Sequence, residues 1–85
     1  MKLYYFCITI KDGEHEYSYT LGLRSRNATN ADKRARQYAK TFLGNRMKWM
    51  DDETLEPDNG YEYRYVEYSG VSETTEQELV NRLMI

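Results

Sequence analysis

The residues best suited to acid–base, nucleophilic or metal chemistry are few in this chain and stand far apart. His15 is the only histidine and Cys7 the only cysteine. A hydrolytic triad needs a histidine base beside its nucleophile, and a cysteine-cluster zinc site needs several thiolates. The chain also has no phosphate-binding loop and no dinucleotide glycine fingerprint. We therefore expect a protein that is not an enzyme and that holds no cofactor and no metal.

Carboxylates are concentrated in residues 51–60, DDETLEPDNG. Asp51, Asp52 and Glu53 are adjacent and lack the alternating ligand pattern of a calcium loop. The same stretch contains the only proline and ends in Asn59-Gly60, a turn signal. The pattern predicts a solvated acidic loop.

Tyrosine is unusually frequent, with nine copies in 85 residues. Residues 61–68, YEYRYVEY, alternate like a strand that carries Tyr61, Tyr63 and Tyr65 on one side. Val66 and Tyr68 fall on the other side, which favours a bulge. Tyrosine is enriched at protein interfaces, and a core this small cannot easily hide so many rings. The predicted partner-binding residues are Asp51, Asp52, Glu53, Tyr61, Glu62, Tyr63, Tyr65, Glu67 and Tyr68.

The net charge of −2 conceals two blocks of opposite sign. Residues 24–48 carry eight basic side chains and one acidic, whereas residues 51–85 carry two basic and ten acidic. A row of cations could contact nucleic-acid phosphates, although the acidic block would repel a polyanion. Alternatively, the blocks complement each other or are simply solvated. The candidate nucleic-acid-binding residues are Lys33, Arg34, Arg36 and Lys40, with Arg24, Arg26, Arg46 and Lys48 near the two ends of the row.

The elements that position these residues begin with a β-hairpin. Leu3 to Ile10 is rich in aromatic and β-branched residues, and Asp12-Gly13 is a strong signal for a two-residue turn. If these two residues form the turn, one face consists almost entirely of apolar and aromatic side chains. The predicted pairs on that face are Ile10 with His15, Ile8 with Tyr17, Phe6 with Tyr19 and Tyr4 with Leu21.

Two helices are predicted. Residues 30–43 place Ala31, Ala35, Tyr38, Ala39 and Phe42 on one face and Lys33, Arg36 and Lys40 on the other. Thr29 or Asn30 would cap this helix, Thr29 with Asp32 resembles a capping box, and Gly44-Asn45 would end it. Thr75 with Glu78 is a second capping box, before an amphipathic helix with Leu79, Val80, Leu83 and Met84.

Together these elements predict one α+β domain over residues 1–85. The sheet would be small and antiparallel, with three to four strands and two helices in the order ββα(β)βα, in which residues 47–49 are the optional strand. A lone free thiol suits a reducing compartment, so we expect a cytoplasmic protein. No segment is long and apolar enough to span a membrane.

The strand-strand-helix-strand order and the acidic tyrosine strand YEYRYVEY resemble small stand-alone proteins of phages and other mobile elements, among them the anti-CRISPR and similar anti-defence proteins. The resemblance lies in layout only and transfers no residue. It implies a non-enzymatic protein-binding module, a stoichiometric inhibitor or adaptor that occludes a larger host complex, including a nucleoprotein complex. Two alternatives are a nucleic-acid-binding protein and a homodimer joined through a strand edge or through the opposite-sign blocks.

Overall fold

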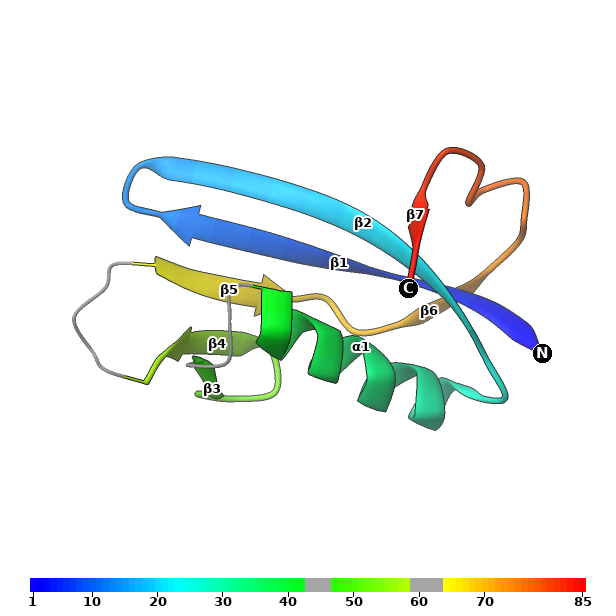
Figure 1. The fold of residues 1–85 in the computed structure, drawn as a ribbon, viewed down its shortest axis with the longest axis horizontal. Helices are drawn as coiled ribbons and strands as arrows, with labels where there is room; N and C mark the ends of the chain where they lie inside the picture. The colour runs from blue at the N-terminus through cyan, green and yellow to red at the C-terminus, as the bar shows by residue number, and fades with distance from the viewer. Residues whose placement is uncertain (43–46, 59–63) are drawn as a thin grey trace.

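The fold is built around a long β-hairpin, whose two strands pair with other strands of the sheet (Figure 1). The structure, a computed structural model, describes residues 1–42, 47–58 and 64–85. Strand β1 (Lys2–Asp12) pairs antiparallel with β2 (His15–Ser25) along its whole length. Gly13 takes a φ of 63° in the turn between them, whereas Glu14 does not have a positive φ. This combination is typical of a type II′ turn, which favours glycine at its first central position.

The hairpin register differs from the predicted one by two residues. Ile10 pairs with Tyr17 and Phe6 with Leu21, because the turn residues are Gly13 and Glu14 rather than Asp12 and Gly13. A shift of two residues leaves every side chain on its original face. The prediction of which side of the hairpin faces the core is therefore confirmed, although each predicted pair is wrong.

The described residues form seven strands in one mixed sheet, not the three or four strands predicted. The remaining strands are β3 (Met47–Trp49), β4 (Thr54–Pro57), β5 (Arg64–Tyr68), β6 (Ser72–Thr74) and β7 (Leu83–Met84). The order across the sheet is β3-β4-β5-β1-β2-β7, with β6 also paired to β1. Among the strand pairs of the described residues, only β7 with β2 is parallel. The predicted fold is wrong in its strand number and in its second helix, whereas the short strand at residues 47–49 is confirmed.

Strand β4 lies where an acidic loop was predicted. Leu55 is fully buried and pairs with Val66, and Thr54 pairs with Glu67. On its other side, β4 pairs with β3. Met47 pairs with Pro57 at one end, and Trp49 pairs with Leu55 at the other. One buried leucine within a proline-containing acidic segment was too weak a signal to predict a strand.

Strands β5 and β6 lie along the same edge of β1 and are separated by a short break. The backbone N–H of Ser69 donates to the carbonyl of Cys7 at 3.1 Å, and the N–H of Cys7 donates to Oγ of Ser69 at 2.8 Å. Gly70 then adopts a φ of 83°, which a side chain would strain. Pairing with β1 is continuous from Arg64 to Tyr68, so the predicted bulge does not occur within these residues.

Helix α1 (Ala28–Phe42) covers one face of the sheet (Figure 1). It begins before Asn30, and its cap is Asn27, whose Oδ1 accepts a 2.8 Å hydrogen bond from the N–H of Asn30. The predicted caps at Thr29 and Asn30 are therefore wrong, and Gly44-Asn45 lies outside the described residues. The buried residues of the helix are Ala31, Ala35 and Ala39, whose small side chains let its backbone lie close to the strands.

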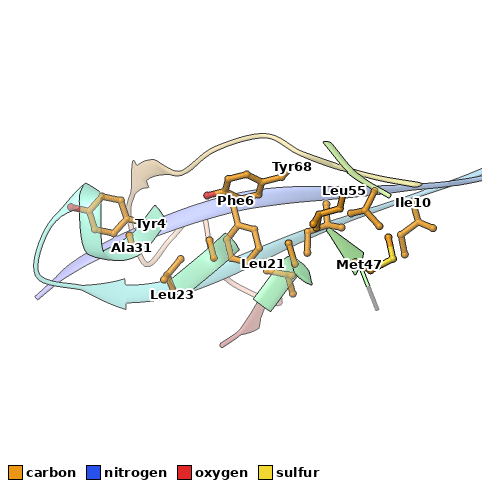
Figure 2. Close-up of a cluster of buried hydrophobic side chains, with 13 residues drawn as sticks. Tyr4, Phe6, Ile10, Leu21, Leu23, Ala31, Met47, Leu55 and Tyr68 are labelled. Carbon is orange, nitrogen blue, oxygen red and sulfur yellow. The ribbon is translucent and has the colours of Figure 1, made fainter. Parts of the chain in front are cut away.

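The hydrophobic core lies between α1 and the sheet (Figure 2). Phe6 is fully buried at its centre, with ring centroids 6.2 Å from Tyr38 and 5.9 Å from Tyr68. Ile8, Leu23, Leu55 and Val66 are also completely buried. The core therefore draws side chains from β1, β2, β4 and β5, and α1 covers them.

The C-terminal segment forms a turn and a strand where a helix was predicted. The capping contact does form, since the N–H of Glu78 donates to Oγ1 of Thr75 at 3.4 Å. The chain reverses at Asn81, which has a φ of 68°, and β7 then pairs with Leu21 and Gly22. A single helical turn is costly to nucleate, and the strand pairing available on β2 replaces its extension.

Candidate functional site

The outer face of the sheet, opposite α1, carries part of the predicted acidic surface. Asp51, Asp52 and Glu53 form an exposed bend between β3 and β4. Oδ1 of Asp51 accepts a 2.8 Å hydrogen bond from the N–H of Glu53, and this bond lowers the pKa of Asp51. The carbonyl of Glu53 accepts a 2.7 Å hydrogen bond from the N–H of Tyr68. The acidic bend is therefore held against β5 by backbone contacts.

Strand β5 presents Tyr65 and Glu67 on this outer face, beside Lys11 of β1. Nζ of Lys11 lies 3.2 Å from Oε1 of Glu67 and 5.6 Å from the centroid of the Tyr65 ring. The hydrogen bond to Glu67 is the main reason that the pKa of Lys11 is raised. Glu67 and Tyr65 are both half-buried, so this strand offers less free surface than the sequence predicted.

A hollow of about 300 Å³ lies beside the acidic bend. Its lining is mostly polar, with two carboxylates on the rim and three hydroxyl groups. The residues that line it are Cys7, Thr9, Glu53, Thr54, Glu67, Tyr68 and Ser69. These groups can accept hydrogen bonds from a cationic side chain. Lys11 already pairs with Glu67, whereas Glu53 forms no ion pair among the described residues.

Tyr68 does not belong to the predicted partner-binding surface. Its side chain is 2% exposed and points toward α1, where its hydroxyl donates a 2.7 Å hydrogen bond to Oδ1 of Asp32. Burial is the main reason that the pKa of Tyr68 is raised. Three more of the predicted partner-binding residues, Tyr61, Glu62 and Tyr63, lie outside the described residues. The structure therefore brings Glu53 and Glu67 to one hollow, with Asp51 bonded to Glu53, and it places Tyr65 beside Lys11. Asp52 instead lies close enough to Arg36 to contribute, after Asp32, to the raised pKa of that side chain, and Tyr68 is separated from the hollow's carboxylates.

Arg36 is drawn inward from the predicted cationic row. Its Nε donates a 2.8 Å hydrogen bond to Oδ2 of Asp32. Its guanidinium lies 4.9 Å from the ring centroid of Trp49 and 5.0 Å from that of Tyr68. The bond to Asp32 is the main reason that the pKa of Arg36 is raised. Such a stacked and paired arginine holds α1 to β3 and β5.

The other cations of the row remain on the surface. Lys33, Arg34 and Lys40 are exposed on α1. The guanidinium of Arg34 donates to the backbone carbonyl of Arg24, and Arg24 in turn pairs with Glu76 at 3.3 Å. Lys33 and Lys40 form no ion pair within residues 1–42, 47–58 and 64–85. The candidate nucleic-acid surface is reduced to these three side chains, and Arg46 lies outside the described residues.

Apolar side chains are exposed at a part of the sheet that the sequence did not single out. Tyr17 and Tyr19 of β2 are 50% and 44% exposed. Leu83 and Met84 of β7 are also exposed, and β7 lies beside β2. Leu83 pairs with Leu21 and so lies on the same face as Tyr17 and Tyr19, whereas Met84 pairs with Gly22 and lies on the opposite face. We call Tyr17, Tyr19 and Leu83 the edge patch. The alternation of β2 predicts Tyr17 and Tyr19 on the core face, but both are only partly covered there, and the ring of Tyr19 packs 5.2 Å from that of Phe42 in α1.

Groups that could perform metal chemistry are sparse. Within the part of the chain that the structure describes, there is no group of three or more His, Cys, Asp or Glu side chains that could hold a metal ion. His15 lies at the start of β2 with its ring stacked 6.4 Å from that of Tyr17. None of the helices in the described residues is long and apolar enough to cross a lipid bilayer.

No family model, no curated protein and no solved structure matches this chain. Function is therefore inferred from the chain's own surfaces.

Proposed function

We propose that this protein is a non-enzymatic protein-binding module that contacts its partner through the hollow beside the acidic bend. The hollow itself is the observation that carries the proposal. It lies on the sheet face that α1 leaves open, and Glu53 and Glu67 stand at its rim. A concave surface with convergent polar groups is where a binding site is expected.

The chemistry of the hollow favours a basic partner. Glu53 forms no ion pair among the described residues, and Asp51 and Asp52 are exposed beside it. The hydroxyls of Thr9, Thr54 and Ser69 add further acceptors. A lysine or arginine of the partner entering the hollow would therefore meet carboxylates and hydroxyls at once.

A basic groove on a larger complex, including one that normally holds nucleic acid, presents such side chains. The role we propose on such a groove is that of a stoichiometric inhibitor or adaptor. Tyr65 adds rigid contact area next to the carboxylates. The proposed surface consists of Asp51, Asp52, Glu53, Tyr65 and Glu67.

Affinity capture with matched charge reversals tests this function. The immobilised chain would be incubated with nuclease-treated cell lysate, and captured proteins would be identified by mass spectrometry. Glu53→Lys should abolish capture of a basic protein, whereas Glu14→Lys at the exposed hairpin tip should not, although both change the net charge equally. Equal capture by the two variants would exclude the hollow as the contact surface.

Nucleic-acid binding is a second candidate, favoured by the exposure of Lys33, Arg34 and Lys40 on one helix. Arg36 is half-buried and bonded to Asp32, so it does not add to this surface, and a strong nucleic-acid site is less favourable. Each phosphate contact should contribute about −0.9 to the slope of log affinity against log salt for B-DNA. Titration of labelled duplex and single strands at two salt concentrations measures that slope. Absence of binding at low salt would eliminate this candidate.

A further inference from the structure

The outer edge of β2 is only partly covered by its neighbour. Strand β7 pairs with β2 at Leu21 and Gly22. Arg82, just before β7, lines a depression together with Thr20, so the chain still flanks β2 at that point. His15 to Tyr19 therefore has no strand beside it among the described residues. An unpaired edge of this length is a template for another strand.

The hydrogen-bonding groups that face outward on this edge can be assigned. The carbonyl of Gly22 accepts a 2.8 Å hydrogen bond from the N–H of Ile85, so the backbone groups of Gly22 point away from β1. In an antiparallel strand these outward groups recur at every second residue. Within the free edge they belong to Glu16 and Ser18, whereas His15, Tyr17 and Tyr19 bond toward β1.

Residues 15–19 lack the features that normally keep an edge strand from pairing with another chain. Residues 15–19, HEYSY, contain no lysine, no arginine and no proline, and Glu16 is their only carboxylate. Tyr17 and Tyr19 expose about half of their surface on the side of the sheet that faces α1. An edge that must stay single normally carries inward-pointing charges, prolines or bulges.

We propose that β2 of a second copy of this chain pairs antiparallel with this edge, with the two-fold axis at Tyr17. Glu16 then pairs with Ser18 of the partner subunit, and the two equivalent pairs exchange four backbone hydrogen bonds. Tyr17 faces the partner's Tyr17 in a non-hydrogen-bonded pair, where side chains approach most closely. The result is a continuous sheet through both subunits, built on an edge that is separate from the acidic hollow.

Self-complementarity of the edge is the reason to assign a second copy as the occupant. The five free residues are centred on Tyr17, and this register sets Glu16 opposite a neutral serine rather than against another carboxylate. It also places the aromatic rings of both copies on the same face. A register centred on Ser18 would instead bring His15 against the position that Leu83 occupies beside Leu21. We therefore prefer the register centred on Tyr17 to the register centred on Ser18.

The mass of the chain in solution tests the dimer first. A contact of this size is expected to be weak, so light scattering or sedimentation should cover about 1 µM to 1 mM. The mass should rise toward that of two chains across this range. A chain that remains monomeric throughout would overturn the proposal and would leave the acidic hollow unaffected.

A pair of charge variants then tests the position of the axis. Tyr17→Lys and Tyr17→Asp should each be monomeric, because each places two like charges across the axis. An equimolar mixture of the two should dimerise again, since the lysine of one copy would meet the aspartate of the other. Dimerisation by either variant alone, or a mixture that remains monomeric, would exclude Tyr17 from the axis.

Backbone variants provide an independent test. Ser18→Pro removes an N–H that is bonded to the partner but not to β1, so it should reduce the association constant at least tenfold while the hairpin stays folded. Ser18→Ala keeps this N–H and loses only the hydroxyl contact to Thr9, so it should dimerise normally. Circular dichroism checks that both are folded. If Ser18→Pro does not fold, the equimolar mixture of Tyr17→Lys and Tyr17→Asp decides whether the dimer forms through this edge.

Discussion

The hydroxyl of Tyr68 donates a 2.7 Å hydrogen bond to Oδ1 of Asp32, and this bond joins β5 to the start of α1. Oδ2 of the same carboxylate accepts from Nε of Arg36, whose guanidinium stacks on the rings of Tyr68 and Trp49. The four side chains form one polar cluster at the helix–sheet boundary. The first three predictions concern this cluster.

Tyr68→Phe should lower the free energy of unfolding by about 1–2 kcal/mol, because it leaves one oxygen of a half-buried carboxylate without its donor. Urea denaturation followed by circular dichroism measures the change. Tyr5→Phe is a suitable control, since the hydroxyl of Tyr5 makes no hydrogen bond among the described residues. A loss of equal size in both variants would mean that the Asp32 contact contributes nothing specific.

Acid should weaken the fold through Asp32. Burial alone would raise the pKa of this carboxyl, but the hydrogen bonds from Tyr68 and Arg36 outweigh burial, and the pKa is lowered. The unfolded chain, with a carboxyl pKa of about 3.9, therefore binds the proton first as the pH falls. The stabilising contribution is complete above about pH 5 and is lost as the pH drops through the folded-state pKa.

Urea denaturation at several values from about pH 7 to pH 3 measures this dependence. Asp32→Asn should be less stable than the wild type at neutral pH and should lose less stability on acidification. Parallel pH profiles for the two proteins would show that other carboxylates account for the acid sensitivity.

Replacing Arg36 by lysine should destabilise the protein by about 1 kcal/mol although the charge is kept, because an ammonium group cannot stack on two rings as the planar guanidinium does. Trp49 is the only tryptophan, so its fluorescence reports directly on this contact. We expect a shifted emission maximum in Arg36→Lys. Lys33→Arg on the exposed face of α1 should leave both stability and emission unchanged.

Gly22→Ala should detach β7 from the sheet. A Cβ atom at this position would lie 2.6 Å from Sδ of Met84 and 3.0 Å from a methyl carbon of Leu79. Overpacking of this kind costs about 1–3 kcal/mol, and the short β7 can relieve it by moving away. Amide hydrogen exchange should show faster exchange at Ile85, whose N–H is bonded to Gly22. Unchanged protection at Ile85 would mean that the side chains rearrange while the strand stays.

Local patterns in the sequence predicted the hairpin faces and the central helix, because both depend on the spacing of apolar residues. Ala31, Ala35 and Ala39 are four residues apart and therefore lie on one face of the helix, and all three are buried. The hairpin register was wrong because Asp12-Gly13 and Gly13-Glu14 both supply a turn glycine, and spacing alone cannot choose between them. The helix cap was missed because Asp32, assigned to a capping box, bonds to Tyr68 and Arg36 instead.

The errors at the C-terminus and in the candidate site have a common cause in long-range pairing. Leu83 and Met84 have helical spacing from Leu79, but the free edge of β2 offers them strand pairing. Tyr68 was placed on the surface because its alternation with Tyr65 could not reveal which side α1 covers. The exposure of the edge patch likewise depends on long-range packing, which no local pattern encodes.

The position of β1 between its neighbours has a consequence for the order of folding. Its hairpin with β2 needs only a two-residue turn, whereas the Cys7–Ser69 contact joins residues 62 positions apart. Closing the longer loop costs more chain entropy. We therefore expect the hairpin to form before β5 and β6 dock on it, which would make the pairing of β1 with its C-terminal neighbours the slower step of folding.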